Sequence, residues 1–107
     1  MNEDIETVYI GESSDIDQGS VENFEYEDND YAIFHLPSGF FATQGHCYCE
    51  ESAFLSEGTI DGEELECASC GRVFSIVSGD SLSNQEDGSA LKIFDITEEE
   101  GKIYLIL

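Results

Sequence analysis

Residues 45–79 read GHCYCEESAFLSEGTIDGEELECASCGRVFSIVSG and contain all four cysteines of the chain. The cysteines form two close pairs, Cys47 with Cys49 and Cys67 with Cys70, separated by seventeen residues. Four thiolates suit a closed tetrahedral zinc site, a [2Fe–2S] cluster or a [4Fe–4S] cluster. Disulfides are the alternative, but two pairs of similar spacing favour one shared metal centre. The C-x-C pair is tighter than the usual spacing of zinc ligands, which favours an iron–sulfur cluster over zinc.

The chain is strongly acidic. Three lysines and arginines oppose 25 aspartates and glutamates, so the net charge is −22 over 107 residues. Such a charge repels the phosphates of nucleic acids and anionic lipid headgroups, so we expect neither as a partner. It attracts a basic protein surface and speeds a short-lived encounter. The same acidity also keeps a protein soluble in a high-salt cytosol, and the two explanations are compatible.

The size of the chain predicts one domain over residues 1–107, with cluster-binding loops at about residues 45–79 inserted in a β base. No apolar run approaches the ~20 residues that a membrane-spanning helix needs. The acidic N-terminus lacks the apolar segment of a secretory signal. We therefore expect a cytoplasmic monomer, in a compartment where cysteine pairs bind metals more often than they form disulfides.

Short apolar segments separated by polar turns predict an all-β fold. The clearest strand is Tyr31–Leu36, and a Pro-Ser-Gly turn joins it to a second strand at Phe40–Thr43. No window of eleven or more residues has the apolar stripe of a helix. The spacing of strands and turns favours an antiparallel β-sandwich or a small barrel. Further strands are expected at residues 7–10, 21–27, 73–77, 91–96 and 102–107, turns at 27–30 and 99–101, and a polar loop at 78–90. The linker at 50–66 is divided by Gly58 and Gly62 into short pieces, one of which is 59–61.

The cysteine stretch resembles the Rieske-type [2Fe–2S] ferredoxins, including those of ring-hydroxylating dioxygenases. That family has the pattern C-x-H, about seventeen residues, and then C-x-x-H, followed by a glycine and an aromatic residue. Here C-x-C and C-x-x-C have the same separation and precede Gly71 and Phe74, and Phe54–Gly58 is similar to the family's A-x-L-S-x-G segment. The hairpins on both sides are similar as well. The resemblance implies a Rieske-like antiparallel β-sandwich with a cluster-binding subdomain of two loops.

Both positions that hold histidine in that family hold cysteine here, at Cys49 and Cys70. The resemblance implies that Cys47 and Cys67 bind one iron, and that Cys49 and Cys70 bind the iron that imidazoles normally hold. Two thiolates in place of two neutral ligands make the oxidised centre more negative. We therefore expect a reduction potential below the Rieske range, toward the roughly −400 mV of plant-type ferredoxins.

The resemblance further implies a soluble one-electron carrier between a reductase and a terminal oxygenase. The sequence has no Ser/His/Asp set, phosphate-binding glycine loop or H-E-x-x-H motif, so we expect no catalytic residues. Two other functions stay open. One is a zinc-binding structural or interaction module on a Rieske-like scaffold. The other is a small subunit of a larger reductase, similar to the nitrite reductase small subunit.

Two histidines lie outside this ligand pattern. His46 precedes Cys47, and we expect it beside the centre or in solvent, because Cys49 already occupies the matching ligand position. His35 belongs to a predicted strand, where a hydrogen-bonded histidine is more common than a ligand. Arg72 follows the second pair and is expected to offset the charge of the centre, to contact a partner, or to be a plain surface residue.

Overall fold

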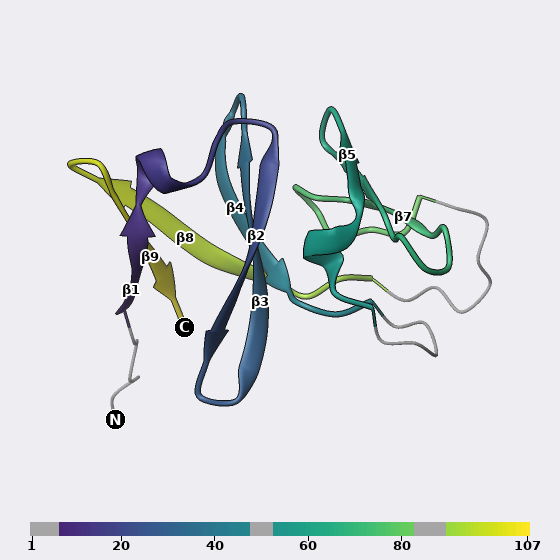
Figure 1. Cartoon of the computed structure of the whole chain (residues 1–107), viewed down its shortest axis with the longest axis horizontal. Coiled ribbons are helices and arrows are strands. Elements are labelled where there is room, and N and C mark those ends of the chain that lie inside the picture. The colour runs from purple at the N-terminus through teal and green to yellow at the C-terminus, as the bar shows by residue number, and fades with distance from the viewer. Residues whose placement is uncertain (1–6, 48–52, 83–89) are drawn as a thin grey trace.

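The computed structural model describes residues 7–47, 53–82 and 90–107, and in them the chain forms two antiparallel β-sheets (Figure 1). The larger sheet has six strands in the order β1-β9-β8-β4-β3-β2, and the smaller has the order β5-β6-β7. The predicted all-β antiparallel architecture is confirmed. The strands are β1 (Thr7–Glu12), β2 (Ser20–Tyr26), β3 (Asn29–Leu36), β4 (Gly39–Gln44), β5 (Thr59–Asp61), β6 (Glu64–Glu66), β7 (Val73–Ser75), β8 (Ile93–Glu99) and β9 (Lys102–Ile106), with single 3₁₀ turns η1 (Ser13–Asp15) and η2 (Leu55–Glu57).

The small sheet is inserted between β4 and β8 of the large sheet. Figure 1 shows it at the right-hand end of the molecule, whereas β1 and β9 lie at the left-hand end. The large sheet is therefore a base, and the cysteine stretch folds as a separate layer on one end of it.

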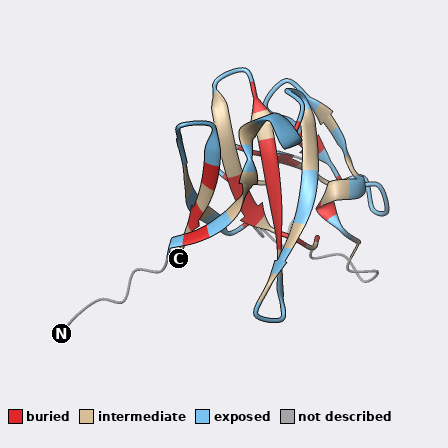
Figure 2. Cartoon of the chain, turned by 60° about the vertical axis from the view of Figure 1, so that its left-hand side comes forward, coloured by how far each residue is buried: buried red, intermediate tan, exposed pale blue. Residues whose placement is uncertain are grey.

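Strand β3 is buried on both faces, because its alternating side chains enter two different cores (Figure 2). One set, Tyr31 and Ile33, packs in the base core. The other set, Ala32, Phe34 and Leu36, packs toward the small sheet in what we call the junction core. This double burial explains why Tyr31–Phe34 is a continuous apolar run instead of an alternating one. The buried members of the base core are Val8, Ile16, Tyr31, Ile33, Ala42, Ile103 and Leu105, and those of the junction core are Ala32, Phe34, Leu36, Cys47, Leu55, Leu65, Cys67, Phe74, Ile76 and Leu91.

The turn between β2 and β3 is shorter than predicted. Glu27 and Asp28 alone form it, with φ values of 53° and 69°, while Asn29 and Asp30 begin β3. A two-residue turn with positive φ at both positions matches the twist of a hairpin. The turn therefore uses a glutamate where Asn or Gly would be the usual choice.

Other elements differ from the predicted ones as well, and β1 extends two residues further, to Glu12. Strand β6 was not predicted. It has three residues, of which two are exposed glutamates and only Leu65 is buried, so its alternation is too short to recognise in the sequence. Strand β7 ends at Ser75, and a turn replaces its last two predicted residues. Strand β8 begins at Ile93 and runs to Glu99. Of the predicted polar loop, residues 83–89 lie outside the described residues.

Candidate metal centre

The first cysteine loop is held by a short backbone ladder that follows β4. The Leu55 N–H donates to the Gly45 carbonyl at 2.8 Å, and the Cys47 N–H donates to the Ala53 carbonyl at 2.9 Å. A glycine is required at the start of this ladder, because a Cβ on Gly45 would lie 2.6 Å from the Cβ of Asp30. The ladder fixes the backbone of Cys47, which is 3% exposed.

The second cysteine loop is a tight turn between β6 and β7. The Cys67 N–H donates to the Arg72 carbonyl at 2.8 Å, and the Gly71 N–H donates back to the Cys67 carbonyl at 3.1 Å. Gly71 has a φ of +77°, a value that glycine adopts without steric cost. The Ser69 N–H lies 3.4 Å from the Cys67 sulfur, in a position to donate to it. The turn folds Cys70 back toward Cys67.

The two loops bring three of the four predicted ligands together. The Sγ atoms of Cys47, Cys67 and Cys70 all lie within 4.8 Å of one another. The Cys47 and Cys70 sulfurs are 3.6 Å apart, much farther than the ~2.05 Å of a disulfide bond. Cys49, the fourth predicted ligand, lies outside the described residues. Three converging sulfurs from two loops are an arrangement that can hold a metal centre.

Burial differs among the three cysteines. Cys47 and Cys67 belong to the junction core and are 3% and 2% exposed, whereas Cys70 is exposed. The centre would thus have one side against the apolar wall of β3 and η2 and another side toward solvent.

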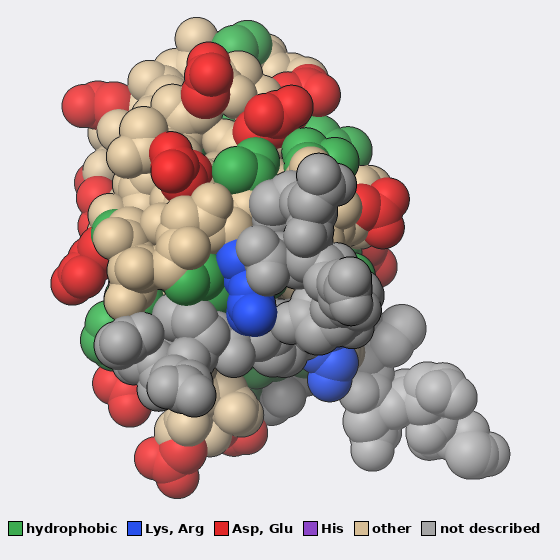
Figure 3. Space-filling model, turned by 90° about the vertical axis from the view of Figure 1, so that its right-hand side faces the viewer, with side chains coloured by type: hydrophobic (Ala, Val, Ile, Leu, Met, Phe, Trp, Pro, Cys, Tyr) green, Lys and Arg blue, Asp and Glu red, His purple; other side chains and the backbone are tan. Residues whose placement is uncertain are grey.

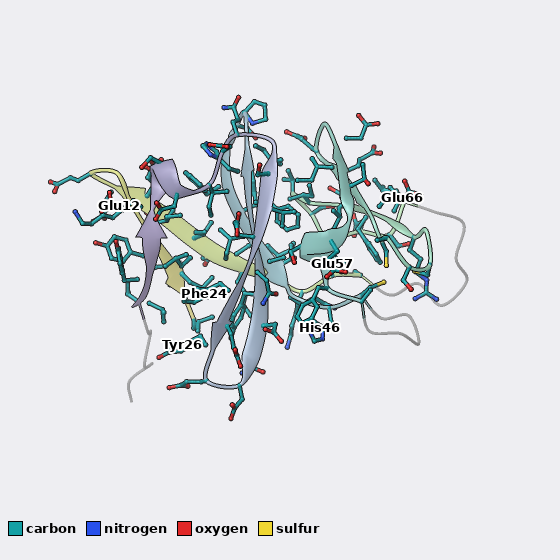
Figure 4. The ribbon with its side chains drawn as sticks, in the orientation of Figure 1. Glu12, Phe24, Tyr26, His46, Glu57 and Glu66 are labelled. Carbon is teal, nitrogen blue, oxygen red and sulfur yellow. The ribbon has the colours of Figure 1, made fainter. Side chains whose placement is uncertain are left out.

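His46 lies at the junction of the two layers and is held by two neighbours (Figure 4). Its Nε2 is 3.1 Å from Asp30 Oδ2, and its ring meets Phe54 edge-on with centroids 4.5 Å apart. Gln44 fixes the backbone beside it, since the Gln44 amide donates to the His46 carbonyl at 2.6 Å. These contacts hold the His46 ring between Asp30 of β3 and Phe54, and its place beside the centre stays a prediction. The Asp30 contact could not be predicted from the sequence, because fifteen residues separate Asp30 from His46 along the chain.

His35 is satisfied within the base, as predicted. Its Nδ1 lies 2.7 Å from the Ile16 carbonyl oxygen, and its ring stacks on Phe40 with centroids 4.0 Å apart. It takes no part in the cysteine cluster.

The end of the molecule that carries the small sheet has a mixed surface. Figure 3 shows Lys and Arg side chains near the middle of this end, hydrophobic side chains above and to the left of them, and Asp and Glu over the upper part and along the edges. Three large apolar residues of the cysteine stretch and the segment after it are exposed, namely Phe54, Val77 and Leu82.

The family profile described as Rieske [2Fe-2S] domain matches residues 6–95. The chain belongs to the Rieske [2Fe–2S] domain family. The match includes both cysteine loops and most of the base.

Known proteins similar to this Rieske domain include carriers of electrons. Ferredoxin CarAc of Metapseudomonas resinovorans is 32% identical over 74 residues, which cover 69% of this chain and 67% of that protein. A ferredoxin chain in the complex of reduced oxygenase and oxidised ferredoxin of carbazole 1,9a-dioxygenase is 27% identical, with a TM-score of 0.84 over 92% of this chain and 91% of that one. The nitrite reductase small subunit of Mycobacterium tuberculosis shares the fold, with a TM-score of 0.84 at 14% identity over 98% of this chain and 97% of that one.

The predicted Rieske fold, the [2Fe–2S] cofactor and the role as an electron carrier are thereby confirmed. The residues present fit the cofactor, because thiolates are the usual ligands of iron–sulfur clusters and three thiols converge here from the two loops that the family uses. None of the helices in the described part of the chain has the length and apolarity needed to span a bilayer.

At Gly58, the chain that follows the first cysteine loop lies close to the backbone that leads into the second loop. A Cβ on Gly58 would lie 2.4 Å from the Glu66 carbonyl oxygen, a backbone atom directly before Cys67. We expect Gly58→Ala to reduce the free energy of unfolding by about 3 kcal/mol, near the upper end for overpacking, and to lower the yield of the assembled centre. Chemical denaturation and the iron content per chain measure the two effects.

The matched control is Gly62→Asn, in the turn between β5 and β6. Gly62 has a φ of +65° and has nothing within 4 Å of its added Cβ, and asparagine tolerates this backbone conformation. This variant should lose less than about 1 kcal/mol. Equal losses in the two variants would contradict the steric role of Gly58.

Proposed function

We propose that this Rieske domain carries one electron on a [2Fe–2S] cluster bound by four cysteines, from a reductase to a terminal oxygenase. The observation that carries the proposal is the convergence of three cysteine sulfurs within 4.8 Å at the ends of two loops. The assigned ligands are Cys47, Cys49, Cys67 and Cys70. The similarity to ferredoxin CarAc, and to the ferredoxin that forms a complex with the oxygenase of carbazole 1,9a-dioxygenase, supports the class of partners.

The surroundings of the cysteines suit an electron carrier. A [2Fe–2S] cluster supplies one-electron redox chemistry. Cys47 and Cys67 hold its inner side in the junction core, where water is excluded. Cys70 is exposed, so a partner that docks on this side would be separated from the centre by little protein.

The surface favours brief docking to a basic partner. A net charge of −22 accelerates the encounter with a positively charged surface, and exposed apolar residues at the cluster end, such as Phe54 and Val77, provide short-range contact. We further infer that residues 1–107 act as one cytoplasmic domain and as a monomer, with the loops at about 45–79 inserted in the β base. The position of the small sheet between β4 and β8 supports this organisation.

The visible spectrum of the purified protein tests the cofactor. Protein prepared under low oxygen should be red-brown, absorb between roughly 400 and 500 nm and hold two irons per chain, because sulfur-to-iron charge transfer gives [2Fe–2S] clusters their colour. Dithionite should bleach it with the uptake of one electron. A colourless protein with one zinc per chain would instead establish the zinc-binding module and rule out the carrier.

Single variants test the assignment of the ligands. Cys70→Ala should lose most of its iron, because a thiolate is removed from the centre. Ser69→Ala changes the neighbouring side chain but keeps the backbone N–H beside Cys67, and it should retain the native iron content. Full iron content in Cys70→Ala would contradict the four-cysteine assignment.

A further inference from the structure

The six-stranded sheet does not close on itself, because its two end strands do not pair with each other in the described part of the chain. Strands β1 and β2 are its two end strands, and among the described residues β1 pairs with β9 alone and β2 with β3 alone. The two strands follow each other in the chain, and η1 lies between them. A cavity of about 230 Å³, which we call the edge cavity, lies between β1, η1 and β2.

The lining of the edge cavity divides into an apolar floor and an acidic mouth. The floor includes Ile16, Ile33 and Ile103, which are 5%, 0% and 0% exposed. The remaining apolar contacts come from Ile10 and Phe24, and Figure 4 shows Phe24 on the side of β2 that faces β1.

Three carboxylates from three elements stand at the mouth, and all three residues are exposed: Glu12 of β1, Asp15 of η1 and Glu22 of β2. One oxygen of Asp15 already accepts a hydrogen bond from the Glu12 N–H at 3.1 Å. No lysine, arginine or histidine is among the described residues that line the cavity. The mouth therefore concentrates negative charge above an aliphatic surface.

This combination matches a long basic side chain. Lysine and arginine lay an aliphatic stem along apolar surface and keep the charged head in a polar environment. The volume is below the ~300 Å³ at which pockets for cofactors and drug-sized ligands begin, and it accommodates one such side chain.

The adjacent backbone can hold the segment that carries this side chain. Tyr26 and Asn29 flank the two-residue turn, and such flanking residues form a hydrogen-bonded pair across a hairpin. The bonding alternates along antiparallel strands, so the backbone N–H and C=O groups of Asn23 and Glu25 point away from β3, toward the outer edge. An extended peptide can pair with an edge of this kind.

We propose that the edge cavity binds a lysine or arginine side chain from an extended segment of a partner protein, which pairs with the outer edge of β2. The site lies on the base, so a partner could hold the carrier there while the cysteine end stays accessible. It would give the carrier a second contact surface, separate from the one used for electron transfer.

NMR titration of the oxidised, cluster-containing protein tests the proposal. The probe is an acetylated pentapeptide of β-branched residues with one central lysine, and the matched peptide has norleucine in its place. The lysine peptide should shift the amide signals of residues 10–16 and 22–25 in a saturable manner and bind about fivefold more tightly than the norleucine peptide, as a partly exposed ion pair allows.

Two variants with the same change in charge separate the cavity from the general acidity. Glu22→Gln should weaken binding of the lysine peptide about fivefold. Glu64→Gln removes the same charge from β6 of the small sheet, outside the lining of the edge cavity, and it should change the Kd less than about twofold. Both variants should keep the visible spectrum of the cluster, so the outcome does not depend on the proposed ligands.

Three outcomes would overturn the proposal. Equal weakening in Glu22→Gln and Glu64→Gln would show attraction to the net charge alone. Equal affinity of the lysine and norleucine peptides would show that the charged amino group of lysine does not contribute to binding. Binding of n-butylammonium chloride as tight as that of the lysine peptide would assign the cavity to a free amine instead of a partner segment.

Discussion

Replacing Cys49 and Cys70 together by histidine is expected to raise the reduction potential by several hundred millivolts. The variant has the two-cysteine, two-histidine ligand set of a Rieske centre, whose potentials lie at roughly −150 to +300 mV, against roughly −400 mV for four-cysteine plant-type ferredoxins. The physical reason is charge. Two neutral imidazoles replace two thiolates, so the added electron enters a centre that carries two fewer negative charges.

Voltammetry of the cluster-containing proteins between pH 6 and pH 10 measures this change. The native potential should stay nearly constant over this range, whereas the potential of the variant should fall at high pH as its new imidazole ligands lose protons. His46→Gln is the matched control, because it removes the histidine nearest to Cys47 and leaves all four cysteines in place. A variant with two irons per chain and an unchanged potential would refute the assignment of Cys49 and Cys70.

The native protein should gain stability steeply with salt. Like charges face each other directly across the strands, as in Asp61 opposite Glu64 and Glu25 opposite Asp30, and such pairs are destabilising. The net charge of −22 adds repulsion over longer distances. Screening shortens from ~10 Å at 0.1 M salt to ~3 Å at 1 M. If this relieves about 2–3 kcal/mol, the melting temperature should rise by roughly 10–20 °C.

Thermal unfolding in sodium chloride between 0.1 and 1 M gives the slope. Sucrose is the control, because it favours burial without screening charge. The melting temperature should therefore rise less steeply with sucrose than with sodium chloride. Glu64→Gln removes one member of a facing pair, and it should raise the melting temperature at 0.1 M more than at 1 M. A flat melting temperature over the salt range would show that repulsion among the carboxylates does not limit the stability of the fold.

Much of the base could be predicted from sequence because its signals are local. The β3–β4 hairpin was expected from a branched and aromatic run that meets a Pro-Ser-Gly turn, and both strands lie there. Strand β6 escaped, because Glu64 and Glu66 are poor strand residues and only the partners on both sides, β5 and β7, make them extended. The length of the turn at Glu27 and Asp28 was not predicted for a similar reason, since the pairing of β2 with β3 sets it.

The cysteines of the candidate site were found because their spacing is a pattern along the chain. The contact between His46 and Asp30 has no such pattern. It arises because Tyr31 of β3 is paired with Gln44 of β4, which brings the residues just beyond that pair together. The edge cavity also depends on tertiary structure, since the order of the sheet separates β1 and β2 although they are neighbours in sequence.

The double burial of β3 has a consequence for the speed of electron exchange. One face of this strand belongs to the core of the base, and the other packs in the core that contains Cys47 and Cys67. Close-packed side chains resist displacement, so the sulfur atoms on this side can shift little when the charge of the centre changes. An environment that is already in place at both oxidation levels adds little reorganisation energy to the transfer. The strand thus favours fast transfer of an electron to or from a docked partner of opposite charge.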